Sequence, residues 1–295
     1  MERLSGGAPS RRSGSPAHRR PRCSVWPVLG RPDFGDTRNC LAACTTTTRS
    51  YVNVAETRFD DWIARRYARL WPELFEPALL EPVIAALADL AEDGPVLEFG
   101  IGTGRVAIPL ARSGVRVQGI EVSEAMVEEL RRQGGPDIEV EIGDFATATV
   151  PGTFRAVYLL RNTITNLTTQ DEQVQVFRNA AHHLEPGGVF VVENYIPNLQ
   201  RLPPGETRVV FAATPDHIGV EDYDLAAQIA VSQHWWLIDG DLKTFHSPHR
   251  FVWPSELDLM AKMAGMALRH RWSDWQRSPF TSESRSHISV WTKPA

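Results

Sequence analysis

The chain has 295 residues, of which 42% are hydrophobic and 23% charged, a composition typical of a globular protein that can bury a sizeable core. The net charge is −5, but residues 1–50 hold nine arginines and three acids, so residues 51–295 carry −11. This acidic part should repel phosphate backbones, and no apolar run reaches the length of about 18 residues that a membrane span needs. We therefore expect neither a nucleic-acid nor a membrane partner.

All three cysteines (Cys23, Cys40 and Cys44) lie before residue 51. The rest of the chain therefore has no thiol for a disulfide framework or a cysteine metal site. No cluster of histidines and carboxylates has metal-ligand spacing either, so we expect no bound metal. This cysteine usage fits a reducing compartment, and we expect a cytoplasmic protein.

Residues 1–50 are rich in Pro, Ser, Gly and Arg and lack hydrophobic periodicity, which predicts a disordered basic extension. Three interpretations stay open. The segment could be a transit peptide, because it is rich in Arg and Ser and poor in acids. It could instead be a tail that contacts an acidic partner, or a non-functional extension, which is the interpretation we favour.

Residues 51–92 are expected to form N-terminal cap helices. Apolar residues recur at helical spacing within Glu56–Leu70. A second helix is predicted over Pro77–Ala91, because the breaker Asp93-Gly94-Pro95 follows it.

Strands and helices then alternate through residues 93–196, the expected core of the fold. The predicted strands are 96–99, 115–120, 138–142, 154–160 and 188–194, and the predicted helices are 104–113, 123–133 and 170–184. This alternation indicates right-handed βαβ crossovers. The fold class is therefore α/β, with a mostly parallel, Rossmann-like sheet covered by helices on both faces.

Residues 197–252 interrupt the alternation. Several β-favouring runs without clear helices within 206–250 predict an antiparallel β insertion, which could act as a substrate lid. Residues 253–295 are expected to close the fold with a helix at 255–264 and strands at 266–275 and 286–293.

A glycine-rich turn follows the first predicted strand, with glycines at Gly100, Gly102 and Gly104. Such a turn lets the backbone approach a nucleotide-like ligand. The dinucleotide fingerprint would need glycine at Arg105, and Glu98 beside the turn would oppose a pyrophosphate but suits an ammonium and a sulfonium. A nicotinamide-dependent oxidoreductase is therefore disfavoured, although it and a non-catalytic cofactor-binding domain remain alternatives.

The run from Glu98 to Gly104 resembles motif I of the class I S-adenosylmethionine-dependent methyltransferases, and further landmarks of that family follow over about 200 residues. The resemblance implies a seven-stranded sheet and S-adenosylmethionine as cofactor. It also implies that Glu121 binds the ribose hydroxyls, that Asp144 reaches the adenine amine, and that Phe145 covers the ring. The whole set of cofactor-binding residues expected on this basis is Tyr67, Glu98, Gly100, Gly102, Gly104, Arg105, Glu121, Val122, Met126, Gly143, Asp144, Phe145, Leu160, Arg161 and Asn162.

A narrower resemblance, to bacterial (actinomycete-type) natural-product methyltransferases, rests on residues 161–163, 167–171 and 253–260. It implies methyl transfer to an N or O atom of a small-molecule acceptor in secondary metabolism, by a monomer or homodimer. No Asn/Asp-Pro-Pro-Tyr/Phe motif follows the fourth strand, which disfavours methylation of nucleic-acid bases.

The acceptor pocket is expected to form from the N-terminal helix and the insertion. Tyr51, Arg58 and Tyr67 could close over the cofactor. Six tryptophans between residues 235 and 291 could wall a pocket, but packing in the core is the interpretation we favour for most of them. His246 is the first candidate for a general base, ahead of His249 and His217.

Overall fold

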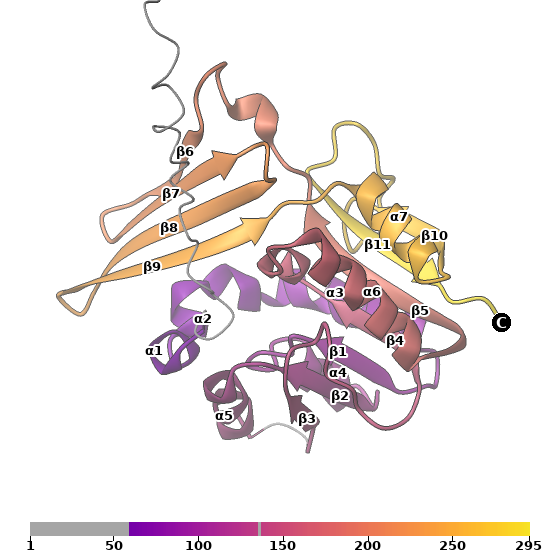
Figure 1. Ribbon diagram of the computed structural model, residues 1–295. Helices are drawn as coiled ribbons and strands as arrows, with labels where there is room; N and C mark the ends of the chain where they lie inside the picture. The colour runs from indigo at the N-terminus through magenta and orange to yellow at the C-terminus, as the bar shows by residue number, and fades with distance from the viewer. Residues whose placement is uncertain (1–58, 135–136) are drawn as a thin grey trace, which may run out of the picture. The chain divides into compact units, whose positions relative to one another are not determined.

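The computed structural model describes residues 59–134 and 137–295 (Figure 1). The expectations for the extension 1–50, for Tyr51 and for Arg58 lie outside the described residues.

A seven-stranded sheet has the order β10-β11-β5-β4-β1-β2-β3. The five strands from β3 to β5 pair in parallel, whereas β11 is antiparallel to both β5 and β10. The predicted seven-stranded, mostly parallel sheet is therefore confirmed. The strands are β1 Val96–Phe99, β2 Val117–Glu121, β3 Glu139–Ile142, β4 Phe154–Leu159, β5 Leu184–Tyr195, β10 Ala267–Trp272 and β11 Ser286–Thr292.

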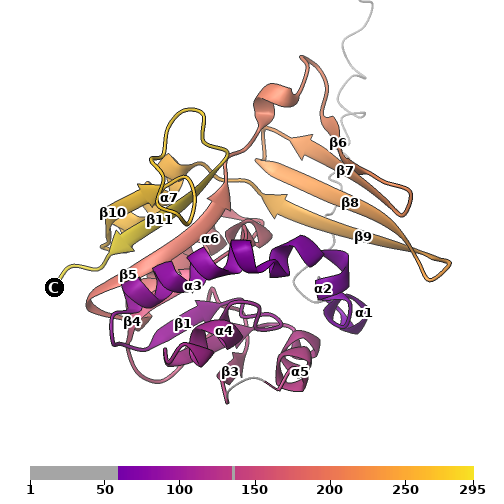
Figure 2. The same ribbon diagram turned by 180° about the vertical axis from the view of Figure 1, so that it is seen from behind.

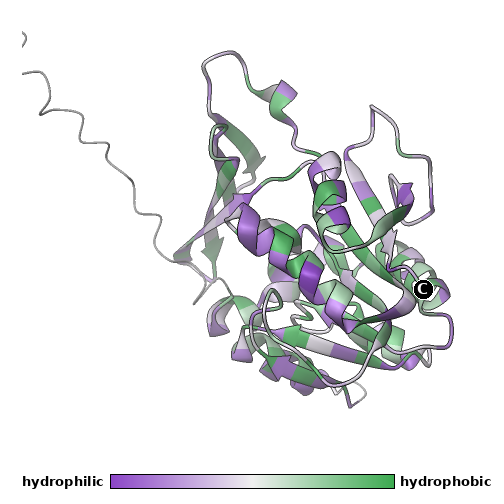
Figure 3. Cartoon of the chain, turned by 45° about the vertical axis from the view of Figure 1, so that its right-hand side comes forward, coloured by the Kyte–Doolittle hydropathy of each residue, from purple (hydrophilic) through white to green (hydrophobic). Residues whose placement is uncertain are grey.

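Helices cover both faces of this sheet, and a separate hydrophobic cluster fills each side. Helices α6 (Gln170–His183) and α7 (Pro254–Met263) pack on the face shown in Figure 1. Helices α3 (Pro77–Ala91) and α4 (Ala107–Arg112) pack on the opposite face, which Figure 2 shows, and α5 is Glu124–Arg132. The central strands of the sheet are largely hydrophobic, whereas the helices beside them carry both hydrophilic and hydrophobic residues (Figure 3), as expected for a buried parallel sheet.

Local signals fix where the helices begin. Ser123 caps α5 by accepting a hydrogen bond from the Met126 amide. A capping box of Thr169 and Glu172, which we did not identify from the sequence, starts α6. Helix α4 begins three residues later than predicted because Gly104, with φ +79°, still belongs to the turn.

A second, antiparallel sheet has the order β6-β7-β8-β9, which confirms the predicted antiparallel insertion. Its strands are β6 Arg208–Ala213, β7 His217–Asp224, β8 Ile229–Ile238 and β9 Asp241–Arg250. A tight Asp239-Gly240 turn joins β8 to β9, with φ values of 55° and 87° that suit this dipeptide.

The predicted helix Glu56–Leu70 is wrong over its described part. The segment forms two short helices, α1 (Asp61–Ala64) and α2 (Tyr67–Leu70), followed by the 3₁₀ helix η2 (Pro72–Phe75). Trp62 and Trp71 both contact Trp236, with ring centroids 6.5 and 5.7 Å away. Nine residues apart, they would point to opposite sides of a continuous helix, so both contacts require a break.

Among the described residues, no helix combines the length and the apolar character needed to cross a bilayer.

Candidate functional site

A cavity of about 660 Å³ lies between the two sheets, within the usual range for small-molecule sites. Loops that follow β1, β2, β3 and β4 form one wall, and the inner face of β7, β8 and β9 forms the other. Phe59, Tyr67 and Trp71 close it from the N-terminal segment. Carboxyl ends of parallel strands are the usual location of ligand sites in α/β folds.

The glycine turn after β1 presents backbone to this cavity. Gly100 and Gly102 have φ values of 68° and 55°, and a Cβ atom added to Gly102 would meet nothing closer than 4.0 Å. Gly104 has another role: its Cβ would lie 2.9 Å from Ile108 and 3.0 Å from Leu130. Gly104 therefore lets the turn pack against α5 and does not line the cavity, contrary to our expectation.

Glu121 ends β2 with its carboxylate fixed by two backbone donors. Oε2 accepts a hydrogen bond from the Gly102 amide and Oε1 from the Ser123 amide, each at 2.9 Å. Burial raises the pKa of Glu121, while these amide donors oppose the shift. Each oxygen keeps further acceptor capacity, so the carboxylate can take both hydroxyls of a ribose diol.

Glu98 is the penultimate residue of the neighbouring strand β1 and is only 5% exposed. Burial raises its pKa to about 8, against the opposing effects of the Arg105 charge and of the Tyr158 hydroxyl, which donates to Oε2 at 3.1 Å. Glu98 is therefore largely protonated near neutral pH until a cation approaches, and an ammonium would favour its ionised form.

The loop after β3 contributes Asp144 and Phe145. Asp144 Oδ1 accepts a hydrogen bond from the Ala146 amide at 2.8 Å, and the Phe145 ring stacks on Phe99 at 6.0 Å between centroids. Both residues line the cavity. Gly143 does not, because its amide pairs with the Glu121 carbonyl and its Cα faces Ala148.

The loop after β4 holds two consecutive non-glycine residues in the left-handed region, Arg161 (φ 51°) and Asn162 (φ 62°). Glu193 of β5 stabilises them: its carboxylate accepts from the Arg161 amide at 2.9 Å and its carbonyl from the Asn162 amide at 3.1 Å. Trp275 orients the same carboxylate with an indole hydrogen bond of 3.1 Å. Such backbone strain is concentrated at functional sites.

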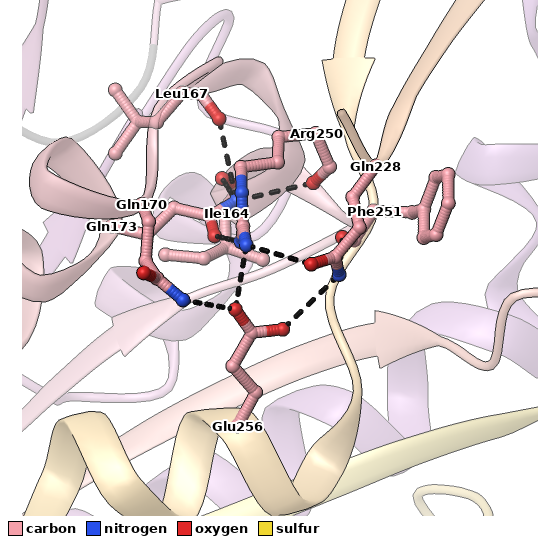
Figure 4. A network of polar contacts seen from close by, with 8 residues as sticks. All are labelled: Ile164, Leu167, Gln170, Gln173, Gln228, Arg250, Phe251 and Glu256. Atoms are coloured by element: carbon pink, nitrogen blue, oxygen red, sulfur yellow. Dashed lines mark hydrogen bonds and ion pairs between the residues drawn. The ribbon is translucent and has the colours of Figure 1, made fainter. Parts of the chain in front are cut away.

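A buried polar network fixes the following loop to the second sheet (Figure 4). Arg250, at the end of β9, donates to Gln173, Gln228 and Glu256. Gln173 donates in turn to the carbonyl oxygens at the two ends of residues 164–167, at 3.1 and 3.3 Å. The cavity wall is therefore braced by side chains from α6, α7 and β9.

Most of the cofactor-binding residues expected from the sequence meet in this cavity. Those that line it are Tyr67, Glu98, Gly100, Gly102, Arg105, Glu121, Val122, Met126, Asp144, Phe145, Leu160, Arg161 and Asn162. Thr103, whose buried hydroxyl has no hydrogen-bond partner among the described residues, lines it too. Backbone amides, fixed carboxylates, a stacked ring and an unpaired hydroxyl together fit an adenosyl ligand that carries an ammonium.

The structure does not bring His246 to the cavity. Its side chain is exposed on the outer face of β9, whereas Phe245, Ser247 and His249 on the inner face line the cavity. His246 therefore lies one residue out of phase with the inner face of its strand. His249 reaches the cavity, with Nδ1 3.5 Å from the Thr165 hydroxyl.

The tryptophans between residues 235 and 291 do not line the cavity either, and Trp236, Trp275 and Trp291 are buried in packing contacts. Sequence reasoning missed the polar residues of the opposite wall. Their signal was the polar residue at every second position of the insertion strands. These residues are Glu221, Ser232, His234 and Ser247; Tyr195, at the end of β5, also lines the cavity and was missed as well.

Within the described residues, no group of three or more His, Cys, Asp and Glu side chains is placed to hold a metal ion.

Comparison with known proteins gives independent evidence. Residues 96–188 match the family model of a methyltransferase domain. The structure of the CcbJ methyltransferase from Streptomyces caelestis is similar with a TM-score of 0.71 and 38% identity, covering 81% of this chain and 99% of that one.

Two further relatives are similar in sequence. Cypemycin N-terminal methyltransferase from a Streptomyces species is 29% identical over 201 residues, which cover 66% of this chain and 81% of the relative. A dTDP-4-amino-2,3,4,6-tetradeoxy-D-glucose N,N-dimethyltransferase from Saccharopolyspora spinosa is 33% identical over 104 residues, which cover 35% of this chain and 41% of the relative.

The likeness to CcbJ covers 81% of this chain and is therefore not confined to the glycine turn, and it leaves the nicotinamide oxidoreductase alternative without support. The chain belongs to the class I S-adenosylmethionine-dependent methyltransferases, and S-adenosylmethionine is its cofactor.

Proposed function

We propose that this enzyme methylates an amine nitrogen of a polar small molecule in secondary metabolism. The observation that carries the proposal is the acidic lining of the cavity: the described residues contribute two arginines and seven carboxylic acids, of which Glu98 ionises when a cation approaches. Such an excess of acids favours cationic ligands. Two of the similar proteins are named for N-methylation, one at the N-terminus of cypemycin and one on an amino sugar.

The cofactor supplies a methyl group already activated by a sulfonium, so the protein has to bind, align and exclude water. In our proposal Glu121 holds the ribose diol, Glu98 receives the ammonium, and the Gly102 backbone allows close approach. Asp144 and Phe145 hold the adenine. The braced loop that begins at Leu160 borders the place where donor and acceptor meet.

We also propose that nucleic acid is not an acceptor, because residues 51–295 carry a net charge of −11 and the cavity is itself acidic. The strand-end loop Arg161-Asn162-Thr163 lacks the motif that we associate with methylation of base amines.

The test supplies purified protein with S-[methyl-³H]adenosylmethionine and a panel of acceptors. D-glucosamine and L-prolinamide offer a primary and a secondary amine, D-glucose offers hydroxyls only, and a short DNA duplex offers base amines. We expect label in one or both small amines and none in D-glucose or DNA. Label in D-glucose alone, or in no small amine at millimolar concentration, would contradict the proposal.

A further inference from the structure

The second sheet turns polar side chains toward the cavity as well as toward its outer face. On β7, Glu221 lines the cavity while its neighbour Val220 does not, and on β8 Ser232 and His234 line it while Val231 and Trp235 do not. A sheet with one solvated face normally turns its apolar residues inward and its polar residues outward. The inward polar face therefore indicates that this sheet contacts a polar ligand.

Glu221 is the centre of that polar face. Its Oε1 accepts a hydrogen bond from the Ser232 hydroxyl at 2.9 Å, and its Oε2 accepts one from the Tyr223 hydroxyl. Two donors from two strands hold the carboxylate in one orientation. Among the described residues that line the cavity, Glu221 is the one acid that the second sheet contributes.

Two titratable residues that line the cavity with Glu221, His234 and Tyr195, carry no charge that would compensate its carboxylate. Burial, and to a smaller extent the nearby His217 and His246, lower the pKa of His234 to about 4, so His234 is neutral at pH 7. Burial raises the pKa of Tyr195, and the Glu221 charge adds to the shift, so this hydroxyl stays protonated. Tyr195 lines the cavity and can donate a hydrogen bond to a polar acceptor.

We propose that Glu221, oriented by Ser232 and Tyr223, is the subsite that binds the acceptor amine and stabilises the charge which its nitrogen gains. This inference rests on the proposed N-methylation. Nothing in the family resemblance assigns the residue a role, and its strand lies outside residues 96–188, which match the methyltransferase domain.

The chemistry explains why a fixed anion is useful at this point. The bound ammonium first loses a proton to water. The freed nitrogen lone pair then forms the new N–C bond while the C–S bond breaks, and the electron pair of that bond stays on sulfur. One positive charge thereby moves from sulfur to nitrogen, and a proton of the methylated ammonium then leaves to water. An oriented carboxylate beside the nitrogen stabilises this developing charge without reorganisation.

The experiment compares the binding of D-glucosamine and D-glucose, which differ by the amine, to protein saturated with S-adenosylhomocysteine, by calorimetry. Wild-type protein should bind D-glucosamine more tightly. In Glu221→Gln this preference should fall roughly 10- to 100-fold, as expected for a hydrogen bond to a charged group. S-adenosylhomocysteine itself should bind the variant with unchanged affinity.

Two further variants complete the test. Asp241→Asn removes an exposed carboxylate from β9 of the same sheet and should leave both affinities unchanged. Ser232→Ala removes one of the two orienting donors and should give an intermediate loss. If Glu221→Gln keeps the amine preference of the wild type, the subsite is refuted while N-methylation stands; if wild-type protein shows no amine preference, both are refuted.

Discussion

The carboxylate of Glu121 joins the glycine turn to the end of β2. Both of its oxygens accept a hydrogen bond from a backbone amide, which fixes the side chain at the place where we propose that it binds the ribose. In Glu121→Gln, an amide NH₂ replaces one of these acceptors and faces a backbone donor. The affinity for S-adenosylhomocysteine should fall by about 1.5–3 kcal/mol, the value of hydrogen bonds to a charged group.

Calorimetry measures this loss, and circular dichroism verifies that the variant is folded. Glu141→Gln, on the exposed neighbouring strand β3, is the matched control and should bind like wild type. Equal affinities for the two variants would refute the role of Glu121.

The raised pKa of Glu98 should make the stability of the folded protein depend on pH. Its folded-state pKa of about 8 lies above the ordinary value of 4.5, because burial disfavours the charged form. Between these values the folded protein retains a proton that the unfolded chain has released. The free energy of unfolding of the cofactor-free enzyme should therefore fall as the pH rises from about 4.5 to about 8.

The measurement is urea unfolding at several pH values, with Glu98→Gln beside wild type. The variant cannot ionise, so its free energy of unfolding should lack this component of the decline. Cofactor binding should release protons from wild-type protein near pH 7, which calorimetry in buffers of different ionisation enthalpy detects. Identical pH profiles for variant and wild type would show that Glu98 does not titrate in this range.

Among single residues, the spacing of sequence motifs predicted those that lie near the carboxyl ends of the parallel strands. Glu98 and Glu121 lie at the carboxyl ends of β1 and β2, and Gly102 follows β1, so the topology brings these three residues together. Glu193 was not predictable, because its function is to hold the strained Arg161 backbone and no local pattern announces it.

Among helices and strands, hydrophobic periodicity predicted the helices that pack one face against a single hydrophobic core. Helix α3 has the predicted bounds, and β1 does as well. The helix predicted over Glu56–Leu70 is wrong because the aromatic side chains of this segment contact two different parts of the protein, the cavity and Trp236. The spacing of apolar residues in the sequence does not distinguish these two contacts from packing against one core. His246 was misplaced for a similar reason: period-2 alternation does not say which of two polar faces points inward.

Arg250 should contribute to the stability of the protein and to the position of the loop beside the cavity. It is 5% exposed and bridges β9 to α6 and α7, so Arg250→Leu would leave the Glu256 carboxylate without its cation. Removing one partner of a buried pair destabilises by about 3–5 kcal/mol. The loop beside Asn162 should also lose its brace, which raises the KM for the acceptor more than it weakens cofactor binding.

Urea unfolding tests the stability, and initial rates test the KM. Arg208→Leu is the control, because Arg208 also pairs with a carboxylate, that of Asp222, but on an exposed edge where ion pairs contribute little. A loss in Arg250→Leu no larger than in this control would show that the network does not brace the loop.

On the scale of the whole molecule, the cavity exists because three separate stretches of chain meet. The glycine turn alone predicted a cofactor site, but the opposite wall comes from an insertion more than 100 residues later in the chain. Its pairing with the N-terminal segment depends on tertiary contacts between aromatic side chains. Local sequence signals carry no information about such contacts, which explains why the acceptor side was the part we predicted least well.

Trp236 is the residue through which these parts are joined. Its ring contacts Trp62 and Trp71 of the N-terminal segment, and it stacks on His234 at 4.7 Å between centroids. Trp236→Ala should therefore lower the free energy of unfolding by about 3–5 kcal/mol and open the cavity, so that both cofactor and acceptor bind more weakly. Trp235→Ala changes the preceding residue, which is only half-buried on the outer face of the same strand, and should leave cofactor affinity unaltered. Because the two variants delete the same side chain one position apart, only the face of the strand differs between them. Equal effects on cofactor affinity would mean that the N-terminal segment does not close the cavity through β8.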